Sequence, residues 1–240
     1  MNVTELALDP ILIPFDDTYI LYDPSDLLSY VLVYFSLLPI GILIFYFSWF
    51  LATRELEAVI IAGGQFVNEI LNNILKNIIK QPRPASFGSS FQKDTLRSAY
   101  GMPSAHSQFM GFFLAYWSLR LVLQWEGIGR ARKAGSILAM VVTTAMVALS
   151  RIYLGYHSRA QVSIGVALGG LLGSLYYLAV GIVRYLGLLD WILTWRIVQR
   201  MWVKDSFNCS SKSLKEEFEA WNLRKVTSKH RKEHSDKKSL

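Results

Sequence analysis

The chain has 240 residues, of which 52% are hydrophobic, 13% aromatic and only 18% charged. Soluble domains carry about 25% charged residues, so this composition indicates a membrane protein. The net charge of +7 belongs to the end of the chain, because residues 204–240 hold ten Lys and Arg against six acids, whereas residues 1–26 hold six acids and no Lys or Arg. A basic tail differs from the basic folded face that nucleic-acid binding requires. The single cysteine, Cys209, excludes an internal disulfide and a thiolate metal cage.

The first 79 residues predict a polar arm followed by two membrane spans. Residues 1–26 are acidic and contain three prolines, unlike a cleavable signal peptide, which has a basic start and then an apolar run. Residues Leu27–Ala52 carry no charge and exceed the roughly 20 residues that cross about 30 Å of hydrocarbon. Glu57–Ile79 is a weaker span, because one helical face carries polar side chains: Gln65, Glu69, Asn72 and Lys76. A carboxylate is costly in lipid, so we expect this face to hydrogen-bond to other helices or to line a wet cavity.

Three further segments without Asp, Glu, Lys or Arg predict three more spans: Pro103–Leu119, Ala134–Ser150 and Ala160–Val183. The last of them is rich in Gly, Ala and Ser, which permit close approach between membrane helices. Residues 81–102 predict a loop, because prolines and glycines bound a serine-rich stretch. Residues 27–186 are therefore expected to form an all-α, polytopic transmembrane bundle of about five spans.

The remaining residues predict an interfacial segment and a tail. Residues 187–203 mix tryptophans with arginines, which is typical of a helix that lies in the membrane interface, and a short sixth span is the alternative. Residues 204–240 are polar and charged and predict a flexible tail. Residues 127–133 carry three cations in a short connection, and the positive-inside rule places this connection and the basic tail in the cytoplasm. The acidic arm, the start of the third span and the end of the fourth then lie on the opposite, lumenal or exoplasmic side.

Three motifs at that lumenal edge carry residues suited to phosphate chemistry: Lys76–Pro84 (KNIIKQPRP), Pro103–His106 (PSAH) and Ser150–Gln161 (SRIYLGYHSRAQ). Arginine is a planar fork that fits phosphate oxygens, and a helix N-terminus attracts anions. Imidazole changes charge near neutral pH and can attack phosphorus or transfer a proton. Each residue alone is ordinary at a membrane edge, where Lys and Arg extend toward the headgroups. Their convergence at one edge indicates a phosphate site.

The spacing of these motifs, Lys-x6-Arg-Pro, Pro-Ser-x-His and Ser-Arg-x5-His, resembles the three-part signature of the type 2 phosphatidic acid phosphatase superfamily, relatives of the vanadium haloperoxidases. The resemblance covers roughly residues 27–184. It implies a helical bundle and hydrolysis of a phosphate ester or anhydride through a phosphohistidine, with no metal and no cofactor. By motif position it makes His157 the nucleophile and His106 the general acid and then base, and it assigns phosphate binding to Lys76, Arg83, Ser104 and Arg151.

One position departs from this signature. The superfamily commonly has Asp four residues after the nucleophilic His, and this chain has Gln161. Residues i and i+4 share a helical face, so the amide of Gln161 can accept a hydrogen bond from the His157 ring and fix its tautomer, but it cannot offset imidazolium charge. With residues 15–24 (FDDTYILYDP), this substitution resembles the dolichyl-diphosphatase branch of fungal type.

That branch implies hydrolysis of dolichyl diphosphate to dolichyl phosphate and inorganic phosphate at the lumenal face of the endoplasmic reticulum membrane. The reaction would recycle the lipid carrier released by protein N-glycosylation. The polyprenyl tail would lie in the bilayer, with its headgroup at the basic membrane edge. The chain ends in Lys237-Lys238-Ser239-Leu240, which resembles the dilysine retrieval signal that coat proteins bind in the cytoplasm. A lysine-rich tail that ends this way by chance is the alternative.

Three other functions remain open at the level of sequence. A lipid phosphate phosphatase of broad specificity, acting on phosphatidate or sphingoid phosphates, would use the same residues. A membrane scaffold without catalytic activity is suggested by Gln161 in place of an acid, although both histidines are present. A transporter is suggested by the polar face of the second span, but it would have no need for paired histidines.

Overall fold

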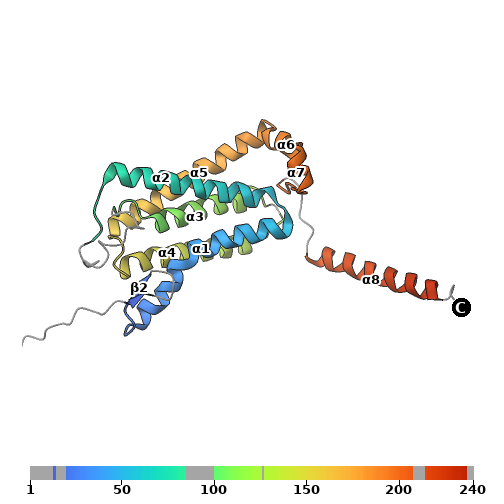
Figure 1. Cartoon of the computed structure of the whole chain (residues 1–240), viewed down its shortest axis with the longest axis horizontal. Coiled ribbons are helices and arrows are strands. Elements are labelled where there is room, and N and C mark those ends of the chain that lie inside the picture. Colours follow the sequence, from blue (N-terminus) through green and yellow to red (C-terminus); the bar gives the residue numbers. More distant parts are fainter. Residues whose placement is uncertain (1–12, 15–19, 85–99, 126, 208–213, 237–240) are drawn as a thin grey trace, which may run out of the picture.

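The computed structural model describes residues 13–14, 20–84, 100–125, 127–207 and 214–236, and five long helices form a bundle (Figure 1). They are α1 (Leu27–Thr53), α2 (Leu56–Ile79), α3 (Ala105–Leu123), α4 (Arg130–Tyr153) and α5 (Arg159–Tyr185). Helices α1, α2, α4 and α5 are long and apolar enough to cross a membrane. The 19-residue α3 lies at the centre and packs against the other four. The predicted all-α membrane bundle is therefore confirmed, with its third predicted span as the central helix.

Helices α3 and α5 share the largest contact of the bundle, and glycines on α5 make it possible. Three of them, four residues apart, face α3: Gly165, Gly169 and Gly173. A Cβ atom on Gly169 would lie 2.0 Å from the carbonyl oxygen of Gln108. Only residues without a side chain allow the two backbones to come this close. Both helices begin at the same end of the bundle, so this contact sets the relative position of the residues at their N-termini.

Side-chain amides join α2 to α3. Asn72 Nδ2 donates to Gln108 Oε1 at 2.7 Å, and Gln108 Nε2 donates to Asn68 Oδ1 at 2.8 Å. Gln65 Nε2 donates to the backbone oxygen of Phe109 at 3.2 Å. These buried groups pair with one another, as polar groups in a membrane bundle commonly do, while Asn72 Oδ1 has no hydrogen-bond partner among the described residues. The expected hydrogen bonding between helices is confirmed for this part of α2.

One residue of the predicted polar face lies elsewhere. Gln65, Asn72 and Lys76 are buried, but Glu69 is exposed on the outer side of α2. A helix turns about 100° per residue, which places Glu69 at the rim of this face, about 20° beyond Lys76. Neighbouring helices cover the face from its other side. Glu69 therefore does not pack against another helix of the chain, which was one of the two expectations for this face.

Two short antiparallel strands precede α1: β1 (Ile13–Pro14) and β2 (Leu21–Tyr22). Just before β2, the buried side chain of Ile20 packs against Val33 of α1 and against Tyr156, which follows α4. The described part of the predicted arm thus lies on the bundle, and most of the arm lies outside the described residues.

The chain returns to the opposite end of the bundle after α5. Residues 187–203, predicted as one interfacial helix, form two short helices, α6 (Leu188–Leu193) and α7 (Arg196–Arg200). Six and five residues are too few to cross a membrane, so the alternative of a sixth span is not realised. Backbone hydrogen bonds then join Lys204 to the α1–α2 turn, from Lys204 N to Arg54 O (3.0 Å) and from Leu56 N to Lys204 O (2.8 Å).

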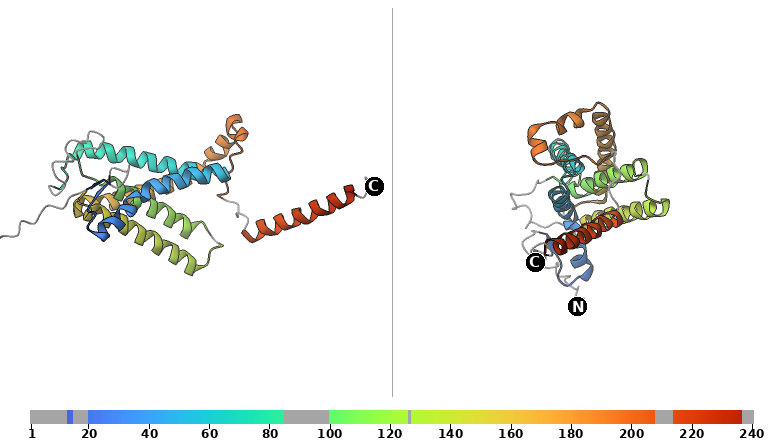
Figure 2. Two further views of the ribbon diagram at one scale, coloured as in Figure 1. Left: turned by 60° about the horizontal axis from the view of Figure 1, so that its bottom comes forward. Right: turned by 90° about the vertical axis from the view of Figure 1, so that its right-hand side faces the viewer.

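The last described segment is helix α8 (Leu214–Asp236), which projects away from the bundle (Figure 2). The sequence predicted a flexible tail over these residues and not a helix. Lys, Glu, Arg, Leu and Ala are good helix formers, so local propensity favours a helix even without an apolar face to bury. The dilysine residues Lys237 and Lys238, and also Cys209, lie outside the described residues.

Candidate active site

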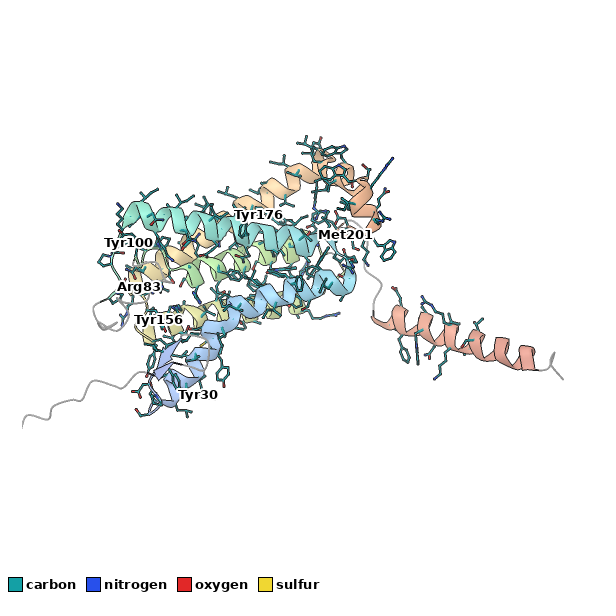
Figure 3. The ribbon with its side chains drawn as sticks, viewed as in Figure 1. Tyr30, Arg83, Tyr100, Tyr156, Tyr176 and Met201 are labelled. Carbon is teal, nitrogen blue, oxygen red and sulfur yellow. The ribbon has the colours of Figure 1, made fainter. Side chains whose placement is uncertain are left out.

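All seven predicted site residues lie at one end of the bundle, although they come from four helices and their connections. They are Lys76 in the last turn of α2, Arg83 after it, Ser104 and His106 at the start of α3, Arg151 in the last turn of α4, His157 in the following turn, and Gln161 in the first turn of α5. Figure 3 shows Arg83 and Tyr156 at this end, with Met201 at the other. Arg83 and His106 are half-buried, and the other five residues are buried.

The turn between α4 and α5 fixes the backbone of His157. Its N–H donates to the carbonyl oxygen of Arg151 at 3.0 Å. Gly155 reverses the chain with a φ of 73°, a left-handed conformation that glycine adopts without steric cost. Ser158 then caps α5, because its Oγ accepts from Gln161 N (3.3 Å) while its own N–H donates to Gln161 Oε1 (3.2 Å). His157 is thus held between the end of one helix and the cap of the next.

The amide of Gln161 determines which nitrogen of His157 carries the proton. Gln161 Nε2 donates to the carbonyl oxygen of Pro82 at 2.9 Å and to Gln81 Oε1 at 3.3 Å. A backbone carbonyl only accepts, so the amide NH2 group must point to Pro82 and Oε1 must point to His157. His157 Nδ1 lies 3.3 Å from this oxygen and therefore acts as the donor. The neutral ring then keeps its lone pair on Nε2, the form that a nucleophile needs.

Three cations surround this imidazole. Burial, and then the positive charges of Arg151, Arg83 and Lys76, lower the pKa of His157 far below its usual value near 6.5. The ring is therefore neutral at physiological pH. A site with three cations and a neutral base favours an anionic group next to the imidazole.

Lys76 is a buried cation in the membrane bundle. Among the described residues no carboxylate forms a salt bridge with it. A buried charge without a counter-charge is costly, and such residues commonly mark a binding site for an ion of opposite sign. The position of Lys76, one helical turn from the end of α2, suits a phosphate at the membrane edge.

Two residues that the sequence analysis missed hold Arg151 in place. Arg151 Nη1 donates to Ser36 Oγ of α1 at 3.2 Å, and the centre of the Tyr156 ring lies 3.9 Å from the guanidinium carbon. Tyr156 also connects to other parts of the site. Its hydroxyl accepts from Leu21 N of the arm (2.8 Å), and its carbonyl accepts from Arg83 Nη1 (3.5 Å). Tyr156 thus links both arginines to the arm.

The sequence held only weak signals for these residues. Ser36 is a polar residue inside an otherwise apolar span, seven positions after Ser29, so both lie on one helical face. That pattern marks an inward face but does not name a partner. Tyr156 had no signal beyond its position before His157.

The start of α3 packs directly on Gln161. Ser104 N donates to the backbone oxygen of Gln161 at 3.2 Å, and Ser107 Oγ donates to Ser104 Oγ at 3.0 Å. The peptide bond between Met102 and Pro103 is cis. A Cβ atom on Gly101 would lie 2.7 Å from the amide atoms of Gln161, so a larger residue would displace this amide. The first N–H groups of α3 therefore lie beside the residues that orient His157.

His106 differs from His157 in its access to water. It is the second residue of α3 and is half-buried. A group that protonates a leaving oxygen and later takes a proton from water must be reached by water, and this exposure permits it. Among the described residues no three His, Cys, Asp or Glu side chains form a group that could hold a metal ion. The metal-independent reaction stays a prediction.

Comparisons with known proteins show which proteins this chain resembles. The chain is 52% identical over 223 residues to the dolichyldiphosphatase of Saccharomyces cerevisiae. This alignment covers 92% of this chain and 93% of the yeast protein. It is 36% identical over 176 residues to lipid phosphate phosphatase gamma of Arabidopsis thaliana, covering 70% and 74%. The crystal structure of a PAP2 type phosphatidylglycerolphosphate phosphatase from Bacillus subtilis matches with a TM-score of 0.47 and 22% identity, covering 61% of this chain and 73% of that one.

The family model of the PAP2 superfamily matches residues 57–185. The matched region runs from α2 to α5 and contains all seven predicted site residues. It spans more than half of the chain, and the yeast relative extends the similarity over nearly its whole length. The chain therefore belongs to the PAP2 superfamily.

Proposed function

We propose that this chain is a dolichyldiphosphatase, which hydrolyses dolichyl diphosphate to dolichyl phosphate and inorganic phosphate. The observation that carries the proposal is a buried, neutral His157, oriented by Gln161 and surrounded by three cations. The similarity to the yeast dolichyldiphosphatase over 92% of the chain supports the choice of substrate. A polyprenyl diphosphate keeps its tail in the bilayer and presents its headgroup at the membrane edge, where these residues lie.

In the first step, His157 Nε2 attacks the terminal phosphorus. An N–P bond forms, and the bond from phosphorus to the bridging oxygen breaks. His106 donates a proton to that oxygen, which leaves as dolichyl phosphate. Lys76, Arg83 and Arg151, with the first N–H groups of α3 after Ser104, stabilise the charge on the pentacoordinate phosphoryl oxygens. Removing one such donor typically costs about 100- to 1000-fold in kcat.

In the second step, His106, now unprotonated, takes a proton from water. The resulting oxygen attacks the phosphohistidine, and the N–P bond breaks to release inorganic phosphate. The two histidines therefore need different surroundings, and the burial of His157 and the partial exposure of His106 support these roles.

The decisive experiment measures phosphate release by the purified protein in EDTA, with dolichyl diphosphate and phosphatidate as competing substrates. We expect the protein to prefer dolichyl diphosphate and to keep its full activity in EDTA. The His157→Ala variant should have no activity. A labelled terminal phosphate should label the wild-type protein in an alkali-stable, acid-labile form and leave His157→Ala unlabelled. Absence of label in a single turnover, or label on His157→Ala, would refute the nucleophile assignment.

A broad lipid phosphate phosphatase is the second candidate. The similarity to the Arabidopsis lipid phosphate phosphatase gamma is the observation in its favour. Equal kcat/KM for phosphatidate and dolichyl diphosphate in the same assay would select it. A scaffold without catalytic activity would release no phosphate from either lipid.

We further propose that the site faces the lumen of the endoplasmic reticulum and that the enzyme recycles the carrier of protein N-glycosylation. The basic connection before α4 and the basic tail support a cytoplasmic far end. Labelling of Gly129→Cys in sealed microsomes, in a Cys209→Ser background, should occur only from the cytoplasmic side, and labelling only from the lumen would reverse the orientation.

The end of the chain supports a retrieval signal. Lys237 and Lys238 would bind coat protein, so the Lys237→Ser/Lys238→Ser variant should leave the endoplasmic reticulum. An unchanged distribution would reject this signal.

A further inference from the structure

The outer side of α2 carries polar side chains where lipid is expected. Glu69, Asn73 and Asn77 are exposed and follow one another at four-residue spacing. Within the described residues, their side-chain hydrogen bonds stay on α2: Asn73 Nδ2 donates to the backbone oxygen of Glu69 (3.0 Å) and to its Oε1 (3.1 Å), and Asn77 Nδ2 donates to Asn73 O (3.0 Å).

Two of these residues lie well inside α2, at the depth of the hydrocarbon when this helix spans the bilayer. Helix α2 ends at Ile79, so Glu69 lies about 15 Å and Asn73 about 9 Å from this end, at 1.5 Å per residue. The helix has 24 residues and is long enough to span the bilayer. Polar groups at such depth are costly when they face acyl chains, so they mark contacts with protein or water.

The other membrane-spanning helices lack this feature. Residues Leu27–Thr53, 134–150 and 160–183 present no exposed charged or amide side chain. Their exposed large residues are apolar, such as Ile44 of α1, Val142 of α4 and Leu171 of α5. The outer face of α2 is therefore the exception among the described spans.

The exposed residues of α2 also follow a heptad pattern. Six of them alternate in steps of four and three residues: Val59, Gly63, Phe66, Ile70, Asn73 and Asn77, here named the α2 seam. Such spacing keeps one line of side chains facing a partner helix. A Cβ atom on Gly63 would meet nothing within 4 Å, so a second helix can approach the backbone there. Glu69 borders the seam.

We propose that the α2 seam is the interface between two copies of this chain in the membrane. Both copies have the same orientation in the bilayer, so a two-fold axis along the membrane normal brings each seam residue close to its own counterpart. An asparagine amide both donates and accepts, so Asn73 can pair with the Asn73 of the second copy. A single buried Asn at such a position favours a parallel, two-stranded pairing.

This arrangement leaves the candidate active site accessible. The opposite side of α2 buries Gln65, Asn68, Asn72 and Lys76 against the bundle, so the α2 seam and the phosphate-binding residues occupy different faces of one helix. Both sites of the dimer would open at the same membrane surface. The proposal rests on the exposed face of α2 and not on the proposed reaction.

Cysteine cross-linking in native membranes tests the interface. The only cysteine is Cys209, so Cys209→Ser provides a background without thiols. Gly63→Cys and Asn73→Cys lie on the seam, and Val142→Cys is the control, exposed near the middle of α4. We expect mild oxidation to yield a covalent dimer of two full-length chains at least tenfold faster at both seam positions than at the control. Equal rates, or a product with a mass other than two chains, would overturn the proposal.

A second measurement does not depend on cross-linking. Single labelled proteins in liposomes should bleach in two steps, and the fraction of two-step events should fall on dilution with lipid. Asn73→Leu/Asn77→Leu gives α2 the apolar surface that the other spans already have, so the bundle should still fold. We expect at least a tenfold weaker dimerisation constant for this variant. Single-step bleaching of the wild type at every dilution, or unchanged dimerisation of the variant, would reject the α2 seam.

Discussion

The side-chain amide nitrogen of Gln161 makes a contact that an acid at the same position could not make. A carboxylate at this position could accept from His157 Nδ1 and Ser158 N, but it could not donate to the carbonyl oxygen of Pro82 as the amide does at 2.9 Å. The amide therefore positions two parts of the site together: the histidine, and the segment that leads to Arg83. An acid would gain a charge near imidazolium and lose this connection.

Gln161→Ala should lower kcat about ten- to a hundredfold, the range expected when a group that orients a functional side chain is removed. The loss should be smaller than that of His157→Ala or His106→Ala. Ser158→Ala is the matched control, because it removes the Oγ cap of α5 and keeps the amide of Gln161. It should cost about 1 kcal/mol of stability and leave kcat near the wild-type value. Wild-type turnover in Gln161→Ala would contradict the orienting role.

The neutral state of His157 predicts how stability depends on pH. Burial and the neighbouring cations lower the pKa of His157 in the folded chain, so the unfolded chain takes up a proton as the pH falls through about 6.5 and the folded chain does not. Acid therefore favours unfolding through this residue. Between pH 8 and pH 5 the wild type should lose about 2 kcal/mol more stability than His157→Asn, measured by denaturant unfolding in detergent. If the free energy of unfolding depended on pH in the same way for both proteins, the pKa of His157 would be the same in the folded and the unfolded chain, which would contradict this prediction.

At the scale of helices, the contact between α3 and α5 should tolerate no side chain at Gly169. A Cβ atom there would lie 2.0 Å from Gln108 O, whereas one on the adjacent Gly170 would meet nothing within 4 Å. Gly169→Ala should therefore cost about 1–3 kcal/mol through overpacking. It should also reduce activity, because the contact aligns Ser104 with Gln161. Gly170→Ala should be neutral or stabilise the helix by up to about 1 kcal/mol. Equal thermal stability of the two variants would contradict this packing.

Hydropathy was enough to predict the helices of the bundle, but it misplaced several of their ends. The span predicted over Ala134–Ser150 is part of α4, which extends from Arg130 to Tyr153. Apolar runs stop at the first charge, whereas a helix continues into the headgroup region, where charged residues are solvated. Helix α8 was missed because helix propensity in a polar segment leaves no periodic apolar signal.

The sequence indicated candidate site residues but not the contacts between them. Spacing within motifs indicated Lys76, Arg83 and His157, because each motif is local in sequence. The contacts of Ser36 with Arg151 and of Leu21 with Tyr156 join residues more than 100 positions apart, and no local pattern encodes such pairs. Glu69 illustrates the same limit. Periodicity placed it on the polar face of its helix, but it did not indicate that neighbouring helices cover the rest of this face and leave Glu69 exposed.

The two ends of the bundle both carry charged residues, but their charges are balanced differently. The site end gathers cations around His157. At the other end, Glu57 is buried between Arg120 (2.8 Å) and Arg184 (2.7 Å), and Arg184 also pairs with Asp205. Two acids thus balance two arginines there. The ring of Phe207 lies over both arginines and shields these ion pairs. The far end therefore joins α2, α3, α5 and the returning C-terminal segment through paired charges.

Glu57→Gln should destabilise the bundle strongly, because it leaves Arg120 and Arg184 with one carboxylate fewer inside the protein. Breaking a buried ion pair from one side costs about 3–5 kcal/mol. Lys204→Gln is the control, since it removes an exposed ion pair, with Glu55 at 3.2 Å, that is worth about 1 kcal/mol or less. Thermal unfolding of both variants in one detergent should separate these costs. Turnover per folded molecule should stay near wild type in both, because Glu57 lies near the start of α2 and Lys76 near its end. A Glu57→Gln protein as stable as Lys204→Gln would show that the charges at this end are solvated and not buried.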